Sequence, residues 1–273
     1  MPELWTAEDR VDEARAAALI RAEFPDVLAQ TVELVSEGWD YVVYRVDGEW
    51  AFRFPRREVV VPGMEREIRC LPALAPHLPV GLPVPTYIGT RFYGAPYLPG
   101  SEATQADAPA VAADLGRALR ALHDLELDLD LPTDPMRRVD MPFRVAQLGE
   151  RGIDAFAEAE SLPQAEATAI CHGDLHVRQL LVDGGRLSGM VDWVDLCRSD
   201  PAVDLSVAWS LLDADARAVF FDAYGPIDRE HELRARVVAA FLSVFIVDWA
   251  RAENVPAVLE SASAGLERAI SGD

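Results

Sequence analysis

The sequence predicts an α+β protein with a strand-rich first part and a larger helical second part, and the change falls at about residue 100. Runs of alternating hydrophobicity and a strong hairpin turn at Asp47-Gly48 occupy residues 31–57. Short runs broken by proline and glycine fill residues 81–104, and an amphipathic helix follows at residues 108–125. The 273 residues are enough for two lobes with real cores, and ligands often bind between two such lobes.

A helix over residues 10–25 is expected to open the chain. The expected members of its apolar face are Val11, Ala14, Ala17, Ala18 and Ile20. Residues 31–57 predict two extended runs that form a hairpin. In the second run, apolar side chains alternate with others, so one face is core and the other carries Arg53. Residues 64–78 predict a helix at their start, and Pro72 limits its interior.

Six aspartates gather between apolar runs in residues 169–206, where a second hairpin is expected. Two apolar runs flank Asp183-Gly184-Gly185, so the ends of the two strands come together. This pairing predicts that Asp174, Gln179 and Asp192 converge. Converging carboxylates usually hold Mg²⁺ or exchange a proton.

Two of these six aspartates have an ordinary structural explanation. Asp183 opens the hairpin turn, and Asp200 caps a helix that Pro201 begins. Asp174 and Asp192 fit such roles poorly, because an apolar residue follows each of them at a strand edge.

Composition excludes several classes of function. The net charge of −21 argues against a nucleic-acid or anionic-membrane partner, and it suits either a cationic substrate or simple solubility. The N-terminus lacks the features of a signal peptide, and no apolar run is long enough to span a membrane, so a cytoplasmic location is expected. Three scattered cysteines (Cys70, Cys171 and Cys197) suggest reduced, buried thiols.

The motifs "HGDLHVRQLLV" and "VDW", with "DPAVDLS" after them, resemble the aminoglycoside and macrolide phosphotransferases. In the first part, "EGWDYVVYRVDGEWAFRFPRR" is similar to that family's nucleotide-covering hairpin, and "EREI" to its glutamate-bearing helix. The resemblance implies a two-lobed protein-kinase-like fold. Its nucleotide-binding lobe would span residues 1–100, and residues 101–273 would form the catalytic and acceptor-binding lobe. It also implies transfer of the γ-phosphoryl group of ATP or GTP, with Mg²⁺, to a hydroxyl of an antibiotic, and hence antibiotic resistance.

The resemblance gives roles to positions in the second part. Asp174 would accept the proton of the acceptor hydroxyl, and Asp192 would bind Mg²⁺. His172 would brace the catalytic loop, and Asp204 would hold that loop from the following helix. Gln179 stands at the second metal position, where the family has asparagine. Because Mg²⁺ demands near-octahedral geometry, we expect this longer side chain to leave the position to water, with one ion held tightly on Asp192.

In the first part, the resemblance implies a nucleotide site. Arg53 stands where the family has a phosphate-binding lysine, and Glu67 would be its ion-pair partner. An arginine can bind phosphate bidentately. The hinge beside the base would be residues 97–100, including Tyr97, Leu98 and Gly100.

A cationic or amino-bearing acceptor is expected, because acids are frequent in the second part. They are Asp154, Glu158, Glu160, Glu230, Glu232, Asp248 and Glu253. A solvated acidic surface explains them equally well. The sequence leaves open which acceptor and which nucleotide are used, and whether the protein is a monomer or a dimer.

Three other functions remain open. The protein could be a kinase of the same fold that acts on choline, a sugar or an amino alcohol. It could instead be a catalytically weak protein that binds nucleotides without transferring phosphate. A third reading takes His172, Asp174 and His176 as an H-x-D-x-H zinc cluster of a hydrolase.

Overall fold

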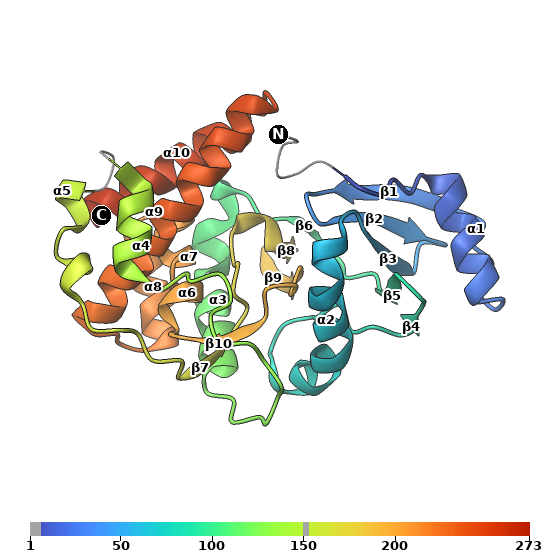
Figure 1. Ribbon diagram of the computed structural model, residues 1–273, viewed down its shortest axis with the longest axis horizontal. Coiled ribbons are helices and arrows are strands. Elements are labelled where there is room, and N and C mark those ends of the chain that lie inside the picture. Colours follow the sequence, from blue (N-terminus) through green and yellow to red (C-terminus); the bar gives the residue numbers. More distant parts are fainter. Residues whose placement is uncertain (1–6, 150–152) are drawn as a thin grey trace. The chain divides into compact units, whose positions relative to one another are not determined.

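The computed structural model describes residues 7–149 and 153–273. The chain divides into two compact units, which are described separately. One comprises the described residues up to Pro76 together with Gly81–Pro99, and the other comprises His77–Val80 and Gly100–Asp273. The first unit contains the elements from α1 to β5 and the second those from β6 to α10 (Figure 1).

A five-stranded antiparallel sheet of order β1-β2-β3-β5-β4 forms the first unit. Its strands are β1 (Val32–Glu37), β2 (Tyr41–Val46), β3 (Trp50–Pro55), β4 (Tyr87–Ile88) and β5 (Tyr93–Pro96). The turn at Asp47-Gly48 joins β2 to β3, as predicted, and both residues have positive φ. The expectation of two extended runs was too simple, because a tight turn at residues 38–40 separates β1 from β2.

Alternation along the strands gives the sheet two different faces. Phe52 and Phe54 join a hydrophobic core with Ala16 and Ile20 of α1 (Glu13–Glu23). The expected apolar face of α1 was partly wrong. Ala14 and Ala18 are exposed, and the buried positions are Ala16, Ala17 and Ile20.

The other face of the sheet carries Arg53, which meets Glu67 of α2 (Val61–Leu74). This helix continues through Pro72, contrary to the expected limit. Proline removes one backbone donor, but α2 buries Cys70, Leu71 and Leu74 on its inner face. That burial offsets the missing hydrogen bond.

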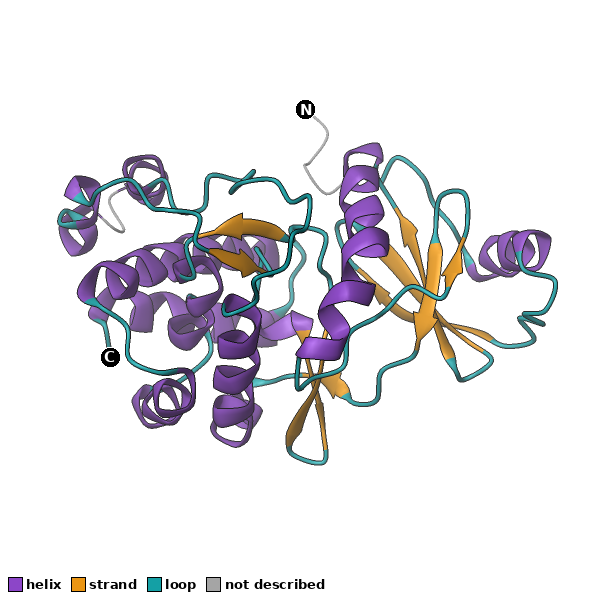
Figure 2. Cartoon of the chain, turned by 90° about the horizontal axis from the view of Figure 1, so that it is seen from below, coloured by secondary structure: helices purple, strands orange, loops and turns teal. Residues whose placement is uncertain are grey.

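Two small sheets in the second unit hold the motif-bearing loops, and both are visible among the helices in Figure 2. The three-stranded sheet has the order β6-β8-β9, and β7 pairs with β10 in the other. The strands are β6 (Ser101–Glu102), β7 (Ala169–Cys171), β8 (Leu180–Asp183), β9 (Arg186–Met190) and β10 (Cys197–Ser199). The predicted second hairpin is therefore β8–β9. Gly184 and Gly185 supply the positive φ that its turn requires.

Helices make up most of the second unit. They are α3 (Ala108–His123), α4 (Met141–Leu148), α5 (Ile153–Phe156), α6 (Ala202–Leu205), α7 (Val207–Ser210), α8 (Ala214–Tyr224), α9 (Arg229–Ala252) and α10 (Pro256–Ser271). The amphipathic pattern at residues 108–125 corresponds to α3. Helices α9 and α10 pack against each other (Figure 1). Within the described residues, no helix has the length and apolar character needed to cross a membrane.

Candidate active site

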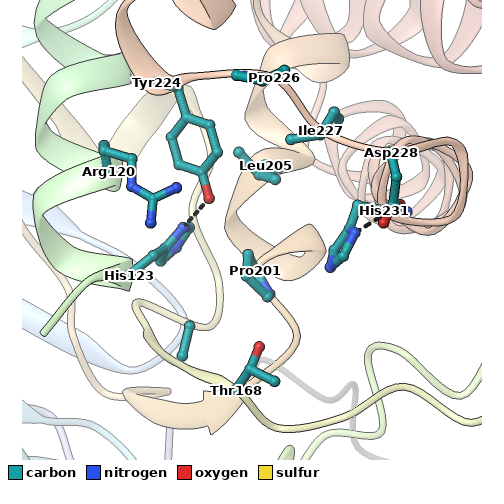
Figure 3. A pocket seen from close by; sticks show the side chains of 11 residues that line it. Arg120, His123, Thr168, Pro201, Leu205, Tyr224, Pro226, Ile227, Asp228 and His231 are labelled. Carbon is teal, nitrogen blue, oxygen red and sulfur yellow. Dashed lines mark hydrogen bonds and ion pairs between the residues drawn. The ribbon is translucent and has the colours of Figure 1, made fainter. Parts of the chain in front are cut away.

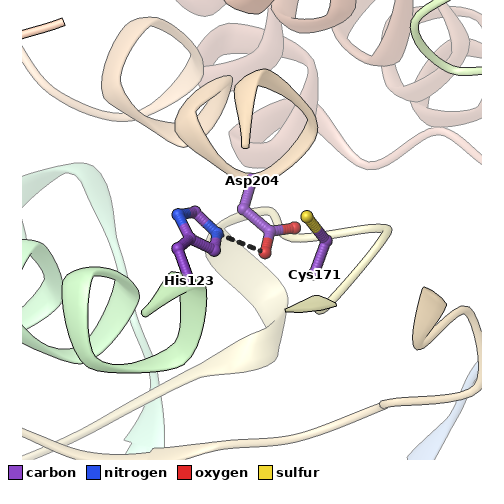
Figure 4. A group of neighbouring side chains, drawn as sticks. All are labelled: His123, Cys171 and Asp204. Carbon is purple, nitrogen blue, oxygen red and sulfur yellow. Dashed lines mark hydrogen bonds and ion pairs between the residues drawn. The ribbon is translucent and has the colours of Figure 1, made fainter. Parts of the chain in front are cut away.

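The loop after β7 carries the H-G-D motif, and a buried carboxylate holds it in place. Asp204 of α6 accepts hydrogen bonds from the backbone N–H groups of His172 at 2.7 Å and Gly173 at 3.0 Å. His123 Nε2 lies 3.1 Å from the same carboxylate (Figure 4). His123 Nδ1 lies 2.8 Å from the hydroxyl of Tyr224. Burial alone would raise the pKa of Asp204, but the bonds and charges around it, that of His123 first, hold the pKa below its ordinary value.

Gly173 allows the loop to pass close to the chain after β9. Its φ is +94°, and a Cβ at this position would lie 2.1 Å from the backbone oxygen of Asp195. Only glycine fits here. His172 lies beside Trp193, with ring centroids 4.6 Å apart and the ring planes tilted by 47°, and its Nε2 lies 3.0 Å from the carbonyl of Val191. Burial lowers the pKa of His172, so the imidazole is neutral, and its contact with Val191 connects the loop to the chain after β9.

Asp174 follows directly and forms an ion pair with a buried arginine. Arg138 Nη2 lies 2.7 Å from Asp174 Oδ1 and 3.0 Å from Asp195 Oδ2. The side chain of Asp174 is 29% exposed, and that of Arg138 is only 7% exposed. Arg138 and Asp195 were not predicted as site residues, because the stretch around Arg138 carries no motif.

The β8–β9 hairpin places Gln179 beside the chain that leads to Asp192. The backbone N–H of Val191 donates to the carbonyl of Gln179 at 2.9 Å. Asp192 has a φ of 67°, which is uncommon outside glycine and is frequent at functional sites. Two predicted site residues are thus neighbours across the strand ends. The loop that bears Asp174 reaches the same strand end through the bond between His172 and Val191.

Gln179 is buried, and its side chain is engaged with His176. Its Oε1 accepts a hydrogen bond from the His176 backbone N–H at 2.9 Å, and its Nε2 lies 2.8 Å from His176 Nε2. Burial lowers the pKa of His176 to about 3, so this ring is neutral. The pair closes the short helical turn Val177–Gln179.

The first unit holds its own buried pair of charges. Arg53 Nη1 lies 3.2 Å from Glu67 Oε1, and the exposed fractions of the two side chains are 7% and 0%. The hydroxyl of Tyr41 donates to Glu67 Oε2 at 2.9 Å, and the Arg53 guanidinium lies 4.2 Å from the centroid of the Tyr41 ring. These contacts fix the guanidinium on the α2 side of the sheet.

The predicted hinge residues lie at the boundary of the two units. The backbone N–H of Tyr97 donates to the carbonyl of Glu49 at 2.8 Å, and Leu98 is half-buried. Gly100 has a φ of +108°, and a Cβ there would lie 2.6 Å from the carbonyl of Val182. Glycine is therefore required where the second unit begins.

The H-x-D-x-H residues do not come together as a zinc site. His172 contacts Val191, His176 contacts Gln179, and Asp174 contacts Arg138. In the part of the chain that the structure describes, the metal-compatible group is a different one, formed by His123, Cys171 and Asp204. There the carboxylate is occupied by backbone N–H groups, and burial raises the pKa of the Cys171 thiol. This group holds the loop in place and does not suit a metal ion.

A cavity of about 350 Å³ lies within the second unit, beside His123. His123 and Tyr224 form part of its wall, and His231 and Asp228 lie at another side (Figure 3). None of the predicted site residues lines it. The cavity is therefore separate from the Asp174 loop.

Many acids of the second unit have arginine partners. Glu158 and Glu232 both pair with Arg229, at 3.2 and 2.9 Å, and Glu230 pairs with Arg234 at 3.2 Å. Asp248 lies 3.9 Å from Arg251 and stays exposed. The side chain of Asp154 lies outside the described residues.

Comparisons with known proteins agree with this architecture. The phosphotransferase enzyme family matches residues 31–237, and a comparison with curated proteins found no match. Among solved structures, the GDP and kanamycin complex of APH(2")-IIia has a TM-score of 0.76 at 19% identity, over 94% of this chain and 99% of that one. Macrolide 2'-phosphotransferase MphH from Brachybacterium faecium has a TM-score of 0.68 at 23% identity, over 93% and 97% of the two chains.

At these identities the structural likeness shows the fold, and the predicted two-lobed kinase-like α+β fold is confirmed. The family match covers well over half of the chain. The protein therefore belongs to the phosphotransferase enzyme family, as the resemblance of its motifs implied, and is a phosphotransferase.

Proposed function

We propose that the protein is a small-molecule kinase that transfers the γ-phosphoryl group of ATP or GTP to a hydroxyl of an aminoglycoside- or macrolide-type antibiotic. The observation that carries the proposal is the Asp174 loop, which Asp204 anchors at two backbone N–H groups and Arg138 contacts at the carboxylate. Structures similar to this chain were solved with GDP and kanamycin, with ATP and streptomycin, and with gentamicin. These complexes support a nucleotide and an aminoglycoside as the two substrates.

Asp174 is the proposed catalytic residue. Its carboxylate accepts or aligns the proton of the acceptor hydroxyl as the oxygen attacks the γ-phosphorus atom, and the bond from phosphorus to the β–γ bridging oxygen breaks. Phosphoryl transfer depends on positioning and charge neutralisation more than on covalent help. A rigid loop suits this task. His172 and Asp204 support it and do not contact the reacting atoms.

Asp192 fits Mg²⁺, and Gln179 does not. Asp192 offers a half-buried carboxylate on a strained backbone, and Mg²⁺ is commonly bound by one or two carboxylates plus substrate phosphates. The amide oxygen of Gln179 already accepts the His176 N–H, and its nitrogen contacts the His176 ring. Asp192 would therefore hold one ion, which neutralises phosphate charge during transfer. The contacts between Gln179 and His176 instead hold the turn Val177–Gln179.

The proposed nucleotide-binding lobe is residues 1–100, and the first unit makes up most of it, without His77–Val80 and Gly100. Arg53 would contact the α- and β-phosphates while Glu67 keeps its guanidinium in place, since an arginine can serve both partners. Tyr97, Leu98 and Gly100 would lie beside the base. Residues 101–273 form the proposed catalytic and acceptor lobe.

The end of α9 is the proposed acceptor-binding element. The Arg178 guanidinium, on the catalytic loop, lies 5.5 Å from the centroid of the Trp249 ring, so this turn of α9 is next to the loop. Asp248 is the exposed acid on that turn. An exposed carboxylate there suits an amino group of an aminoglycoside.

The test is a panel assay with Mg²⁺ and either ATP or GTP. The acceptors are kanamycin, gentamicin, streptomycin, a macrolide, choline and a sugar alcohol, and phosphorylated products are measured by mass spectrometry. We expect phosphorylation of at least one antibiotic and a loss of about 10²–10⁴-fold in Asp174→Asn, which retains nucleotide binding. Products from choline or the sugar alcohol alone would assign a metabolite kinase. Nucleotide binding without any product would assign a binding protein.

A cytoplasmic location, where both nucleotides are abundant, agrees with this activity. Expression in a susceptible bacterium should raise the inhibitory concentration of the antibiotic that is phosphorylated. The Asp174→Asn variant should not raise it.

A further inference from the structure

Arg138 is the buried cation that contacts the proposed catalytic carboxylate. One guanidinium nitrogen, Nη2, lies 2.7 Å from Asp174 Oδ1 and 3.0 Å from Asp195 Oδ2. Asp174 comes before β8 and Asp195 comes after β9, so one arginine joins the chain at both ends of the hairpin. The backbone of Asp195 also lies directly against Gly173.

The loop that carries Arg138 is fixed from several sides. The Asp134 carboxylate accepts the backbone N–H groups of Arg138 at 2.7 Å and Val139 at 3.1 Å. The backbone N–H of Asp134 donates to the carbonyl of Arg198 in β10 at 3.0 Å. Arg144 Nε donates to the carbonyl of Arg137 at 2.9 Å. A side chain on such a loop can impose an orientation on its partner.

Charge also favours this arrangement. Burial lowers the pKa of Arg138, but the carboxylates of Asp174 and Asp195 outweigh burial and raise it above the ordinary value. The guanidinium therefore keeps its charge. The ion pair at 2.7 Å holds one oxygen of the Asp174 carboxylate against a fixed cation and so restricts the rotation of the whole group.

We propose that Arg138 is a positioning residue that sets the orientation of the Asp174 carboxylate toward the acceptor hydroxyl and ties it to Asp195. The inference rests on the proposed function for its effect on turnover. With 7% of its side chain exposed, Arg138 acts through Asp174 and not by contact with the phosphates.

Arg138→Met and Arg138→Lys test the inference, with Arg236→Met as the matched control. Arg236 of α9 is also a buried arginine, and it donates to the carbonyls of Ala269 at 3.0 Å and Ile270 at 2.8 Å in α10. We expect Arg138→Met to lower kcat by about 10²-fold, the cost of a small misplacement at the reacting centre, with the nucleotide KM within about threefold. Arg138→Lys should recover about tenfold of that loss, because an ammonium restores the charge but not the position of Nη2 between the two carboxylates. Arg236→Met should lower Tm by a similar amount, with kcat within about threefold.

A kcat in Arg138→Met within threefold of the wild type overturns the inference, as does an equal loss in Arg236→Met. Crystal structures of the wild type and Arg138→Lys give a second measurement. It needs no acceptor, and it can be made even if Arg138→Met folds poorly. We expect the Asp174 carboxylate to turn or to occupy several conformers in the variant. An unchanged carboxylate overturns the inference even if no acceptor is found. A wild type that phosphorylates nothing in the panel contradicts the proposed function instead.

Discussion

Replacing Asp204 with asparagine should loosen the loop that carries Asp174. The carboxylate accepts hydrogen bonds from the N–H groups of His172 and Gly173 and is bonded to His123, at 2.7, 3.0 and 3.1 Å. Asparagine keeps one acceptor oxygen, so at least one backbone N–H then faces an NH₂ group. A hydrogen bond to a charged group contributes about 1.5–3 kcal/mol, and a buried unpaired donor costs about 1–3 kcal/mol. Because these two losses overlap, we expect the loop to lose about 3 kcal/mol of stability against local opening.

Amide hydrogen exchange, read by mass spectrometry on peptides spanning residues 170–182, measures this opening. Since 1.4 kcal/mol is a factor of ten, protection should fall by about 10²-fold. Asp213→Asn is the control, because Asp213 caps α8 through the Ala216 N–H at 2.9 Å and asparagine caps a helix equally well. Protection that falls less than about threefold in Asp204→Asn, or equally in Asp213→Asn, would refute the reasoning.

Three further outcomes are expected. In Mg²⁺ titrations of kcat/KM, Asp192→Ala should lose nearly all activity and Gln179→Ala much less, because the Gln179 amide is bonded to His176; equal, near-total losses would make Gln179 a metal ligand. The pKa of His176 is about 3 in the folded protein and about 6.5 in the unfolded chain. Between these pH values the unfolded state binds one more proton than the folded state. The free energy of unfolding therefore falls as the pH drops below about 7. By pH 5 this amounts to about 2 kcal/mol, which urea titrations should show in the wild type and not in His176→Gln; an equal pH dependence in both proteins would exclude it. Asp248→Asn should raise the KM for kanamycin and leave the KM for nucleotide unchanged, with Glu230→Gln as the control because Glu230 is paired with Arg234; an unchanged kanamycin KM would remove α9 from the acceptor site.

Local patterns were enough to predict most of the fold. Both hairpins were predicted because their turns depend on residues that tolerate positive φ, namely Asp47-Gly48 and Gly184-Gly185. The prediction that Pro72 would limit the helix was wrong. The low helix propensity of proline does not take into account the apolar surface that the rest of α2 buries. Tertiary packing decided that helix.

From the residues alone, contacts in the candidate site could be predicted where they follow from one hairpin, whereas the Arg53–Glu67 pair and the Asp204 contact with the loop were implied by the family resemblance. Gln179 and the chain leading to Asp192 meet because β8 and β9 pair, which the apolar runs indicate. Arg138 meets Asp174 through a long connection without a motif. Its neighbour Arg137 is 59% exposed and pairs with Asp140, whereas Arg138 is 7% exposed. Nothing local distinguishes two adjacent arginines, so this contact required the structure.

Surroundings assign different tasks to the aspartates that gather after β7. Asp204 is fully buried, and its carboxylate oxygens are hydrogen-bonded to a backbone N–H and to an imidazole, so this carboxylate stabilises the fold. Asp200 is nearly as buried and accepts the Ala202 N–H at 2.9 Å; it lies one residue before the N-cap of α6, because Pro201 is the N-cap and not the first helical residue as expected. Asp174 and Asp192 keep partial exposure, and substrate can contact only carboxylates that solvent also reaches. The dense carboxylates are therefore neither one metal cluster nor one solvated face, because the buried ones immobilise the loop on which an exposed one can act.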